Sequence, residues 1–209
     1  MQIAFLLYPG FTALDAIGPY DVLSRIPGAE TVFVAERRGP VRNEVGSLSL
    51  VAERALGQTP SPDVLVVPGG LGNRRLLEHT PLLDWLRAAH RSTSWTTSVC
   101  TGSLLLAAAG ILDGLPATTH WLARDLLQSL GARPVPDRVV EQGKIITAAG
   151  VSSGIDMALV LVQRMLGDEA AQAIQLGIEY DPRPPFDSGS PEKAPPEIVA
   201  AVRARAATL

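Results

Sequence analysis

Short apolar runs alternate along this chain with longer segments in which apolar residues recur every three or four positions. The runs predict buried strands over residues 2–8, 31–35 and 63–67, and a fourth strand that leads into Cys100. The segments between them predict helices over roughly 15–25, 81–91, 103–109 and 119–130. Continuous apolar strands separated by helices are typical of a parallel sheet covered on both faces. The pattern therefore predicts an α/β fold.

The second half of the pattern adds a hairpin, one long helix and a polar tail. Residues 139–147 are typical of two strands that turn at Gln142-Gly143, and Ser153 to Asp156 resembles a capping box that opens a helix ending near Leu166. After Tyr180 the chain is rich in Pro, Ser and charge, until a short helix predicted over 196–206. We expect one domain over 1–209, with 181–209 as an extended Pro-rich tail and short helix packed on it.

Three turns that could carry chemistry each follow a predicted strand. They are Pro9-Gly10, Pro68-Gly69-Gly70 and the turn at Cys100. In parallel sheets, sites form beyond the carboxyl ends of the strands, so all three turns fall on the edge where a site is expected. Their convergence predicts one active site.

Cys100, the only cysteine of the chain, lies between a β-branched strand and a helix-forming run. Ser98 and Gly102 give the pattern small-x-Cys-x-Gly, which is the steric solution that serine hydrolases use to place a nucleophile on a sharp turn. The amides and dipole of the following helix are expected to favour the thiolate. A lone cysteine is more often a small core residue. These neighbours instead predict an exposed residue on a strained backbone.

A thiolate needs a partner that moves protons, and Asp15 at the opening of the first helix is the candidate. Small and apolar neighbours would raise its pKa and let it hold a proton for delivery. The alternative is that Asp15 only caps the helix. The glycine turn at Gly69 and Gly70 is a candidate oxyanion hole made of backbone amides, to which Thr101 would add its own.

His120 suggests a Cys–His dyad with Cys100, with Asp125 one helical turn further on as the partner of the imidazole. A lone histidine before a tryptophan is more often structural, so His120 is kept only as a candidate residue behind the site. With one cysteine and three histidines, a Cys/His zinc site is not expected. We expect no metal and no organic cofactor.

Composition and charge exclude several classes of partner. The net charge is −3 and there is no basic run, which argues against nucleic acid and an anionic membrane as partners. No apolar stretch approaches the roughly 18 residues of a membrane span. The first residues are typical of a strand rather than a signal peptide. We expect a soluble, cytoplasmic protein that acts on a small molecule.

These segments together resemble the ThiJ/PfpI superfamily over nearly the whole chain. The marks are the first-loop acid Asp15 followed by Gly18-Pro19-Tyr20-Asp21-Val22, Val67-Pro68-Gly69-Gly70, the turn at Cys100, and Ala117-Thr118-Thr119-His120. The resemblance implies a flavodoxin-like three-layer sandwich of the class I glutamine-amidotransferase type. It also implies that Cys100 is the nucleophile, that Asp15 contacts the sulfur, and that the protein is a homodimer.

Two departures from the superfamily pattern narrow the activity. Thr101 stands where PfpI-type peptidases have a histidine directly after the cysteine, and the first-loop acid is Asp15 where deglycase-like members carry Glu. Both features resemble the isocyanide hydratase branch, which implies an isocyanide as the small-molecule substrate. The alternatives are a glyoxalase or deglycase-like cysteine hydrolase, and a non-enzymatic ligand-binding or redox-sensing domain.

Overall fold

The computed structural model describes residues 1–207 and divides the chain into two compact units, Met1–Ile178 and a segment that begins at Glu179. The strands of the first unit are β1 Gln2–Leu6, β2 Glu30–Ala35, β3 Gly39–Arg42, β4 Ser49–Ala52, β5 Arg54–Ala55, β6 Val64–Val67, β7 Trp95–Val99, β8 Pro116–Ala117, β9 Arg133–Pro134, β10 Val139–Gln142 and β11 Ile145–Ala148. Its helices are α1 Ala13–Leu23, α2 Thr80–Ser92, α3 Gly102–Ala108, α4 Arg124–Ser129, α5 Ser153–Leu166 and α6 Asp168–Gly177, with 3₁₀ turns η1 Leu56–Gln58, η2 Leu71–Arg75 and η3 Trp121–Ala123.

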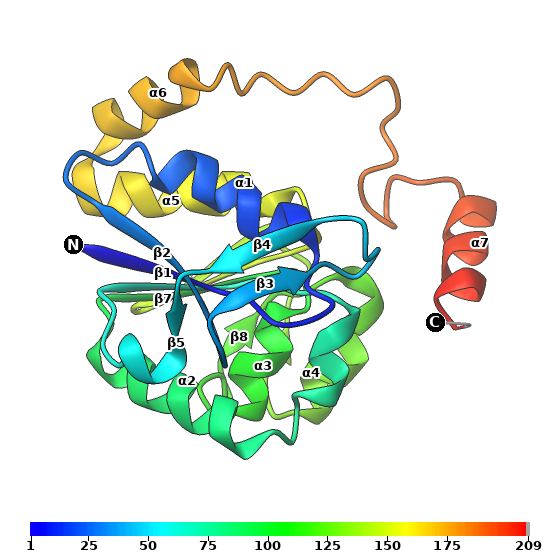
Figure 1. The fold of residues 1–209 in the computed structure, drawn as a ribbon. Coiled ribbons are helices and arrows are strands. Elements are labelled where there is room, and N and C mark those ends of the chain that lie inside the picture. Colours follow the sequence, from blue (N-terminus) through cyan, green and yellow to red (C-terminus); the bar gives the residue numbers. More distant parts are fainter. Residues whose placement is uncertain (208–209) are drawn as a thin grey trace. The chain divides into compact units, whose positions relative to one another are not determined.

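The centre of the first unit is a seven-stranded sheet in the order β10-β11-β7-β6-β1-β2-β5 (Figure 1). All neighbouring strands in it run parallel except β10, which pairs antiparallel with β11. The antiparallel pair is the predicted hairpin over 139–147, and the parallel strands confirm the predicted α/β architecture. The carboxyl ends of β1, β6 and β7 therefore meet at one edge of the sheet, where the three turns lie.

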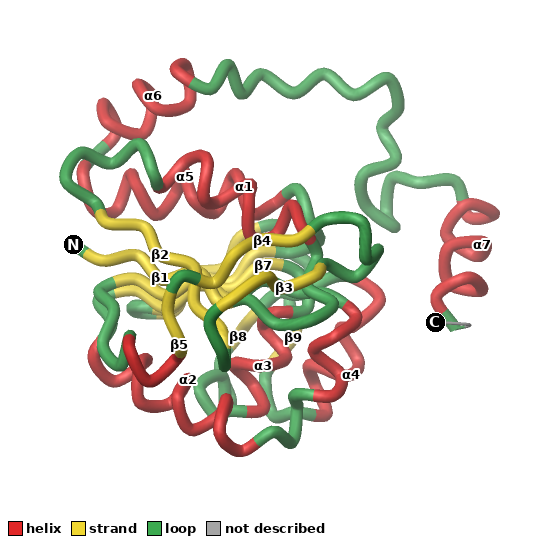
Figure 2. The backbone as a smooth tube through the Cα atoms, in the orientation of Figure 1, coloured by secondary structure: helices red, strands yellow, loops and turns green. Residues whose placement is uncertain are grey.

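Both faces of the sheet are covered, and the side chains of β1 show how. Ile3 and Phe5 belong to the core beneath α1 and α5, whereas Ala4 and Leu6 belong to the core beneath α2 and α3. Figures 1 and 2 show these two helical layers on opposite sides of the strands. Side chains of a strand alternate between its faces, so a continuously apolar strand requires both layers.

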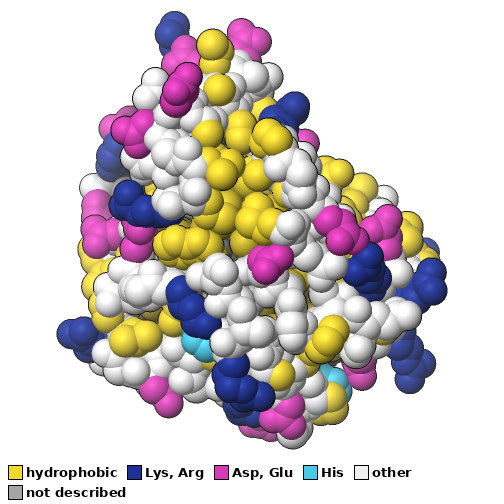
Figure 3. All heavy atoms as spheres, turned by 90° about the vertical axis from the view of Figure 1, so that its left-hand side faces the viewer, with side chains coloured by type: hydrophobic (Ala, Val, Ile, Leu, Met, Phe, Trp, Pro, Cys, Tyr) yellow, Lys and Arg dark blue, Asp and Glu magenta, His cyan; other side chains and the backbone are white. Residues whose placement is uncertain are grey.

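The helical layer that holds α5 and α6 presents apolar side chains to its surroundings. They gather in the upper half of the face seen in Figure 3, with charged side chains around them. Leu159, Val160 and Ala171 line a shallow groove of about 260 Å³ between α5 and α6. Leu176 on α6 is 81% exposed.

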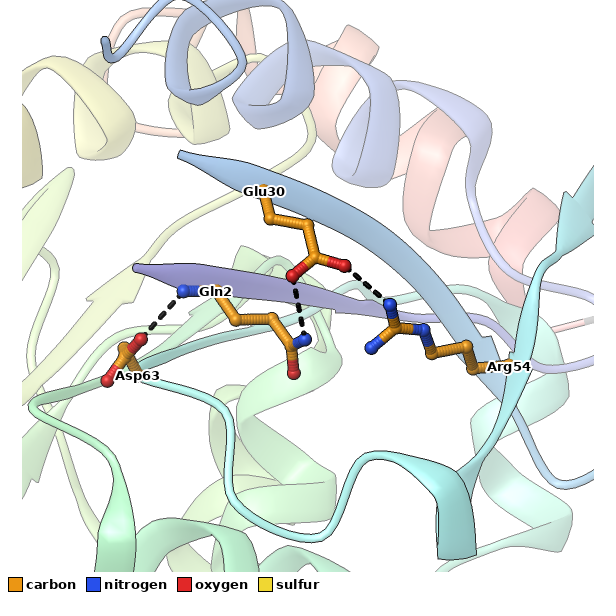
Figure 4. Close-up of polar contacts among 4 residues, drawn as sticks. All are labelled: Gln2, Glu30, Arg54 and Asp63. Atoms are coloured by element: carbon orange, nitrogen blue, oxygen red, sulfur yellow. Dashed lines mark hydrogen bonds and ion pairs between the residues drawn. The ribbon is translucent and has the colours of Figure 1, made fainter. Parts of the chain in front are cut away.

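Polar contacts tie the amino ends of the strands together (Figure 4). The Gln2 amide donates to Asp63 Oδ2 at 2.6 Å, and the Gln2 side-chain amide donates to Glu30 Oε2 at 3.2 Å. Arg54 forms an ion pair with the other Glu30 oxygen at 2.5 Å. These groups are exposed, so each pair contributes at most about 1 kcal/mol. The contacts join the first residues of β1 and β2 to Asp63, directly before β6, and to the Arg54 side chain of β5.

The structure differs from the sequence prediction in two helices. The helix expected over 119–130 begins only at Arg124, because Thr118 and Thr119 are extended and hydrogen bond to other strands and turns. The capping box at Ser153 is wrong: Ser152 precedes α5 without a side-chain cap, and the Asp156 carboxylate pairs with Arg138.

Several elements of the structure have no counterpart in the prediction, among them the β3–β4 pair and helix α6. The antiparallel pair β3–β4 stands outside the main sheet and carries a tight loop in which Asn43 Oδ1 accepts from the amides of Gly46 and Leu48. Helix α6 buries only Ile174, with Ala170 and Ala171 packed against the same core, so the apolar stripe that predicts a helix is short. The β3–β4 hairpin matters below, because its loop supplies a residue to the site.

The second unit contains the helix α7 Pro196–Ala206, which confirms the prediction over 196–206. Before it, ion pairs join Arg183 to Asp181 and Lys193 to Asp187. The packing of 181–209 on the domain stays a prediction, and its last two residues lie outside the described residues. None of the helices within 1–207 combines the length and apolar character that crossing a membrane requires.

Candidate active site

Cys100 lies between the end of β7 at Val99 and the start of α3 at Gly102, with a positive φ of 56°. A non-glycine residue at positive φ is strained, and it keeps this conformation only where the surrounding structure holds it. The Cys100 amide donates to Ala149 O at 2.8 Å, and its carbonyl accepts from Ser103 Oγ at 3.2 Å and Thr119 Oγ1 at 3.1 Å. These bonds fix the turn.

The glycine two residues after Cys100 is required by close packing. A Cβ on Gly102 would lie 2.1 Å from the carbonyl oxygen of Val67, at the end of the neighbouring strand. Only glycine lets α3 start this close to β6. The pattern small-x-Cys-x-Gly therefore reflects contact between the two strand ends that form the site.

Cys100 is buried, with 5% of its surface exposed, so the expectation of an exposed cysteine is wrong. Burial raises the pKa of its thiol, and the nearby Asp15 carboxylate raises it further. The amides of Thr101 and Val151 lower the pKa, but by less. The amide at the start of α3 therefore favours the thiolate, as predicted, but desolvation and the neighbouring acid outweigh it and the net pKa is raised.

Asp15 stands in the first turn of α1 and is completely buried. Its Oδ2 accepts a hydrogen bond from the Gly69 amide at 2.9 Å, and its Oδ1 has no hydrogen-bond partner among residues 1–207. Thr12 occupies the cap position of α1, so the alternative in which Asp15 only caps the helix is not what the structure contains.

Burial raises the pKa of Asp15 to about 7, and the Glu44 carboxylate adds to the rise. The Gly69 amide and a contact with the Cys100 thiol lower the pKa, without cancelling the effect of burial. Both members of the Cys100–Asp15 pair thus resist ionisation. A pair of interacting groups titrates as one unit, so above a pH of about 7 the two side chains share one negative charge and one mobile proton.

The glycine turn holds Asp15 and Thr101 in place. The Gly70 amide donates to Thr101 Oγ1 at 3.0 Å, and Asn73 Nδ2 donates to the Thr101 carbonyl at 2.8 Å. The Gly69 amide donates to Asp15 Oδ2. Both amides that the sequence suggested as an oxyanion hole therefore already have acceptors within the protein. The amides that contact the sulfur are those of Thr101 and Val151.

Several residues of the site were missed by the sequence analysis, and Tyr8 and Glu44 are two of them. Tyr8 is buried two residues after the end of β1 and its hydroxyl donates to the Pro68 carbonyl at 2.8 Å. Glu44, on the β3–β4 hairpin, accepts from Thr12 Oγ1 at 2.9 Å and from the Leu71 amide at 3.2 Å. It thereby joins the first loop to the glycine turn. No motif around Glu44 in the sequence indicates a role in the site. The hairpin that carries it was not predicted either.

His120 does not form the dyad with Cys100 that its sequence position suggested. Its Nδ1 accepts from the Leu122 amide at 3.3 Å, and its ring packs closely on the backbone of Gly150. Within residues 1–207 it contacts neither Cys100 nor Asp125 through a hydrogen bond or ion pair. Burial lowers its pKa, so it is neutral. Thr119, one residue earlier, is the side chain that reaches Cys100.

We expect Gly69→Ala to disrupt the site. The new Cβ would lie 2.6 Å from both the Thr101 amide nitrogen and Oγ1, and 2.9 Å from Asp15 Oδ2. Displacing these groups by a fraction of an ångström should lower turnover by about 10²-fold. Gly57→Ala is the matched control, because nothing lies within 4 Å of its Cβ. Turnover and the temperature of thermal unfolding are measured for both variants. Equal turnover in the two variants would contradict this packing argument.

Comparison with known proteins gives a consistent family. A model of the DJ-1/PfpI family matches residues 1–164. The chain is 47% identical over 207 residues to the isonitrile hydratase of Pseudomonas putida, covering 99% of this chain and 90% of that protein. It is 34% identical over 175 residues to the HTH-type transcriptional regulator CdhR of Pseudomonas aeruginosa, of which it spans 51%. The crystal structure of a ThiJ/PfpI family protein from Pseudomonas syringae superposes with a TM-score of 0.95 at 38% identity, covering 99% of this chain and 86% of that one.

Proposed function

The chain belongs to the DJ-1/PfpI family, and we propose that it adds water to an isocyanide to give the N-substituted formamide. The observation that carries the proposal is the 47% identity to an isonitrile hydratase over nearly the full length of both proteins. The buried Cys100–Asp15 pair supports it, because the pair combines a sulfur nucleophile with an acid whose pKa is about 7. Such a pKa suits an acid that must give and take protons near neutrality.

The first half of the reaction forms a covalent intermediate. With the shared proton on Asp15, the Cys100 sulfur attacks the terminal carbon of R–N≡C, and Asp15 delivers its proton to the same carbon. The product is a thioimidate, R–N=CH–S–Cys100, and Asp15 is left ionised. The pair starts the step with a single proton, on Asp15, and that proton ends on the substrate carbon. The sulfur is already ionised and needs no separate base.

The second half returns the pair to its starting state. Ionised Asp15 takes a proton from water as the water oxygen attacks the thioimidate carbon, and then passes that proton to the nitrogen. The carbon–sulfur bond breaks, the hydroxyl proton returns to Asp15, and R–NH–CHO leaves. The Thr101 and Val151 amides face the sulfur, where they stabilise the departing thiolate. Gly69, Gly70 and Asn73 position Asp15 and Thr101.

The test is a panel of aliphatic and aromatic isocyanides, with formamide detected by ultraviolet absorbance. We expect formamide to form in proportion to the enzyme, with rates across the panel reporting the R group that the pocket accepts. Absence of formamide from every isocyanide, with folded protein, would overturn the proposal. Consumption of methylglyoxal instead would favour the glyoxalase alternative. Homodimer formation, implied by the family resemblance, and a cytoplasmic location, expected from the sequence composition, stay predictions.

We expect the activity to rise as the pH rises through about 7, because the first step starts from the pair with one proton and one negative charge, and that state forms when the doubly protonated pair loses a proton. Glu44→Gln removes a negative charge that raises the pKa of Asp15, so the activity of the variant should rise at a lower pH than that of the wild type. Glutamine can still accept from the Leu71 amide, which preserves the loop. Glu53 is an exposed acid between β4 and β5, so Glu53→Gln is the control and should leave the pH profile unchanged. A shift of the Glu44→Gln profile to higher pH would contradict the assigned role.

A further inference from the structure

A cavity of about 520 Å³ lies beyond the carboxyl ends of β1 and β2, and Cys100 and Asp15 do not line it. This volume falls in the range of roughly 300–1,000 Å³ that is typical of small-molecule sites. Its floor consists of buried apolar side chains, namely Leu6, Leu7, Ala35, Val41 and Leu82. The cavity therefore suits the apolar body of a ligand.

Three arginines line the same cavity without partners. Arg37, Arg38 and Arg42 are exposed, and within residues 1–207 their side chains form no hydrogen bond or ion pair. The one acid among the lining residues, Glu36, faces His79 Nε2 at 3.5 Å. Unpaired guanidinium groups are donors with the planar geometry that carboxylates accept in pairs. In a chain of net charge −3, this local excess of positive charge points to an anionic ligand.

Tyr8 lies between the cavity and the Cys100 site, since it lines the cavity and is close to Asp15 and Cys100. Tyr8 lines the cavity, while its hydroxyl donates to the Pro68 carbonyl on the side of the glycine turn. A molecule in the cavity would therefore contact the wall of the Cys100 site without approaching the sulfur. Substrate and the second ligand could be bound at the same time.

We propose that this cavity is a second binding site, for an amphipathic carboxylate whose apolar body fills the floor and whose carboxylate pairs with Arg37 and Arg38. A chain of about eight carbons has the size and composition that the apolar floor accepts. The Arg42 guanidinium and the His79 imidazole supply further polar contacts at the rim. The site is independent of the reaction at Cys100 and does not rest on the proposed function.

The experiment is isothermal titration of the full-length protein with octanoate. We expect saturable binding of one octanoate per chain, and at least about tenfold weaker binding by octylamine, which has the same tail and the opposite charge. The double variant Arg37→Gln/Arg38→Gln should weaken octanoate binding about tenfold or more. Arg74→Gln/Arg75→Gln is the matched control: these arginines are also exposed and adjacent in sequence but do not line the cavity.

Filling the cavity gives a second, independent test. Leu76 is a half-buried lining residue, and Leu76→Trp should abolish octanoate binding while the turnover at Cys100 persists. Cys100→Ser should bind octanoate as the wild type does. Failure of octanoate to bind the wild type, equal weakening in the two arginine double variants, or unchanged binding in Leu76→Trp would each overturn the proposal. None of these results depends on whether isocyanides are substrates.

Discussion

Replacing Cys100 by alanine is expected to lower formamide production by roughly 10³-fold or more, the loss that follows removal of a covalent nucleophile. No other thiol exists in the chain to take over the attack. The change should leave the fold intact, because the removed sulfur is one small buried atom and the bonds that hold the turn come from the backbone and Thr119. Turnover of an isocyanide, followed as formamide, is the measurement.

Cys100→Ser serves as the control for shape. It keeps a hydroxyl in place of the thiol, but a buried serine next to an acid is a far weaker nucleophile than sulfur. Both variants should unfold at temperatures close to that of the wild type. Formamide production by Cys100→Ala at a wild-type rate would rule out the thioimidate.

Replacing Asp15 by asparagine should lower turnover by about 10²–10⁴-fold, the range for loss of a general acid–base group. The amide oxygen of asparagine can still accept from the Gly69 amide, so the change removes the mobile proton and leaves the loop in place. The remaining activity should lose its dependence on pH near 7, since the group with that pKa is gone. A pH profile of turnover measures both effects.

Two further variants define the role of Asp15. Asp15→Glu keeps the carboxyl on a longer side chain in a fully buried position, so it should retain partial activity at most. Asp21→Asn, on the exposed side of the same helix, is the matched control and should behave as the wild type. Full activity in Asp15→Asn would show that the carboxyl carries no proton in the reaction.

Much of the fold was predictable because the strands are short, apolar and buried on both faces. Of the strands that carry the site, β1 and β6 were anticipated within two residues of their ends, and β7 as the strand that leads into Cys100. Their parallel order places Pro9-Gly10, Gly69-Gly70 and Cys100 on one edge, as the sequence analysis expected. Local pattern was sufficient there, since burial on both faces leaves a continuous apolar run.

What could not be predicted depends on contacts between distant segments. Glu44 reaches the site from a hairpin outside the main sheet, and only the folded chain brings it to Thr12 and Leu71. The sign of the Cys100 pKa shift was missed for the same reason. The helix start is visible in sequence, whereas full burial and the proximity of the Asp15 carboxylate are not. The acceptors of the Gly69 and Gly70 amides, on Asp15 and Thr101, are likewise visible only in the tertiary structure.

The most direct test of the central claim compares two substrates on one preparation of the wild-type protein. The catalytic efficiency for an isocyanide, measured as formamide formed, is set beside that for methylglyoxal, with Cys100→Ala as the blank for both. We predict that the isocyanide is turned over at a catalytic efficiency well above that for methylglyoxal, and that Cys100→Ala abolishes its turnover. Methylglyoxal turnover well above isocyanide turnover would contradict the account.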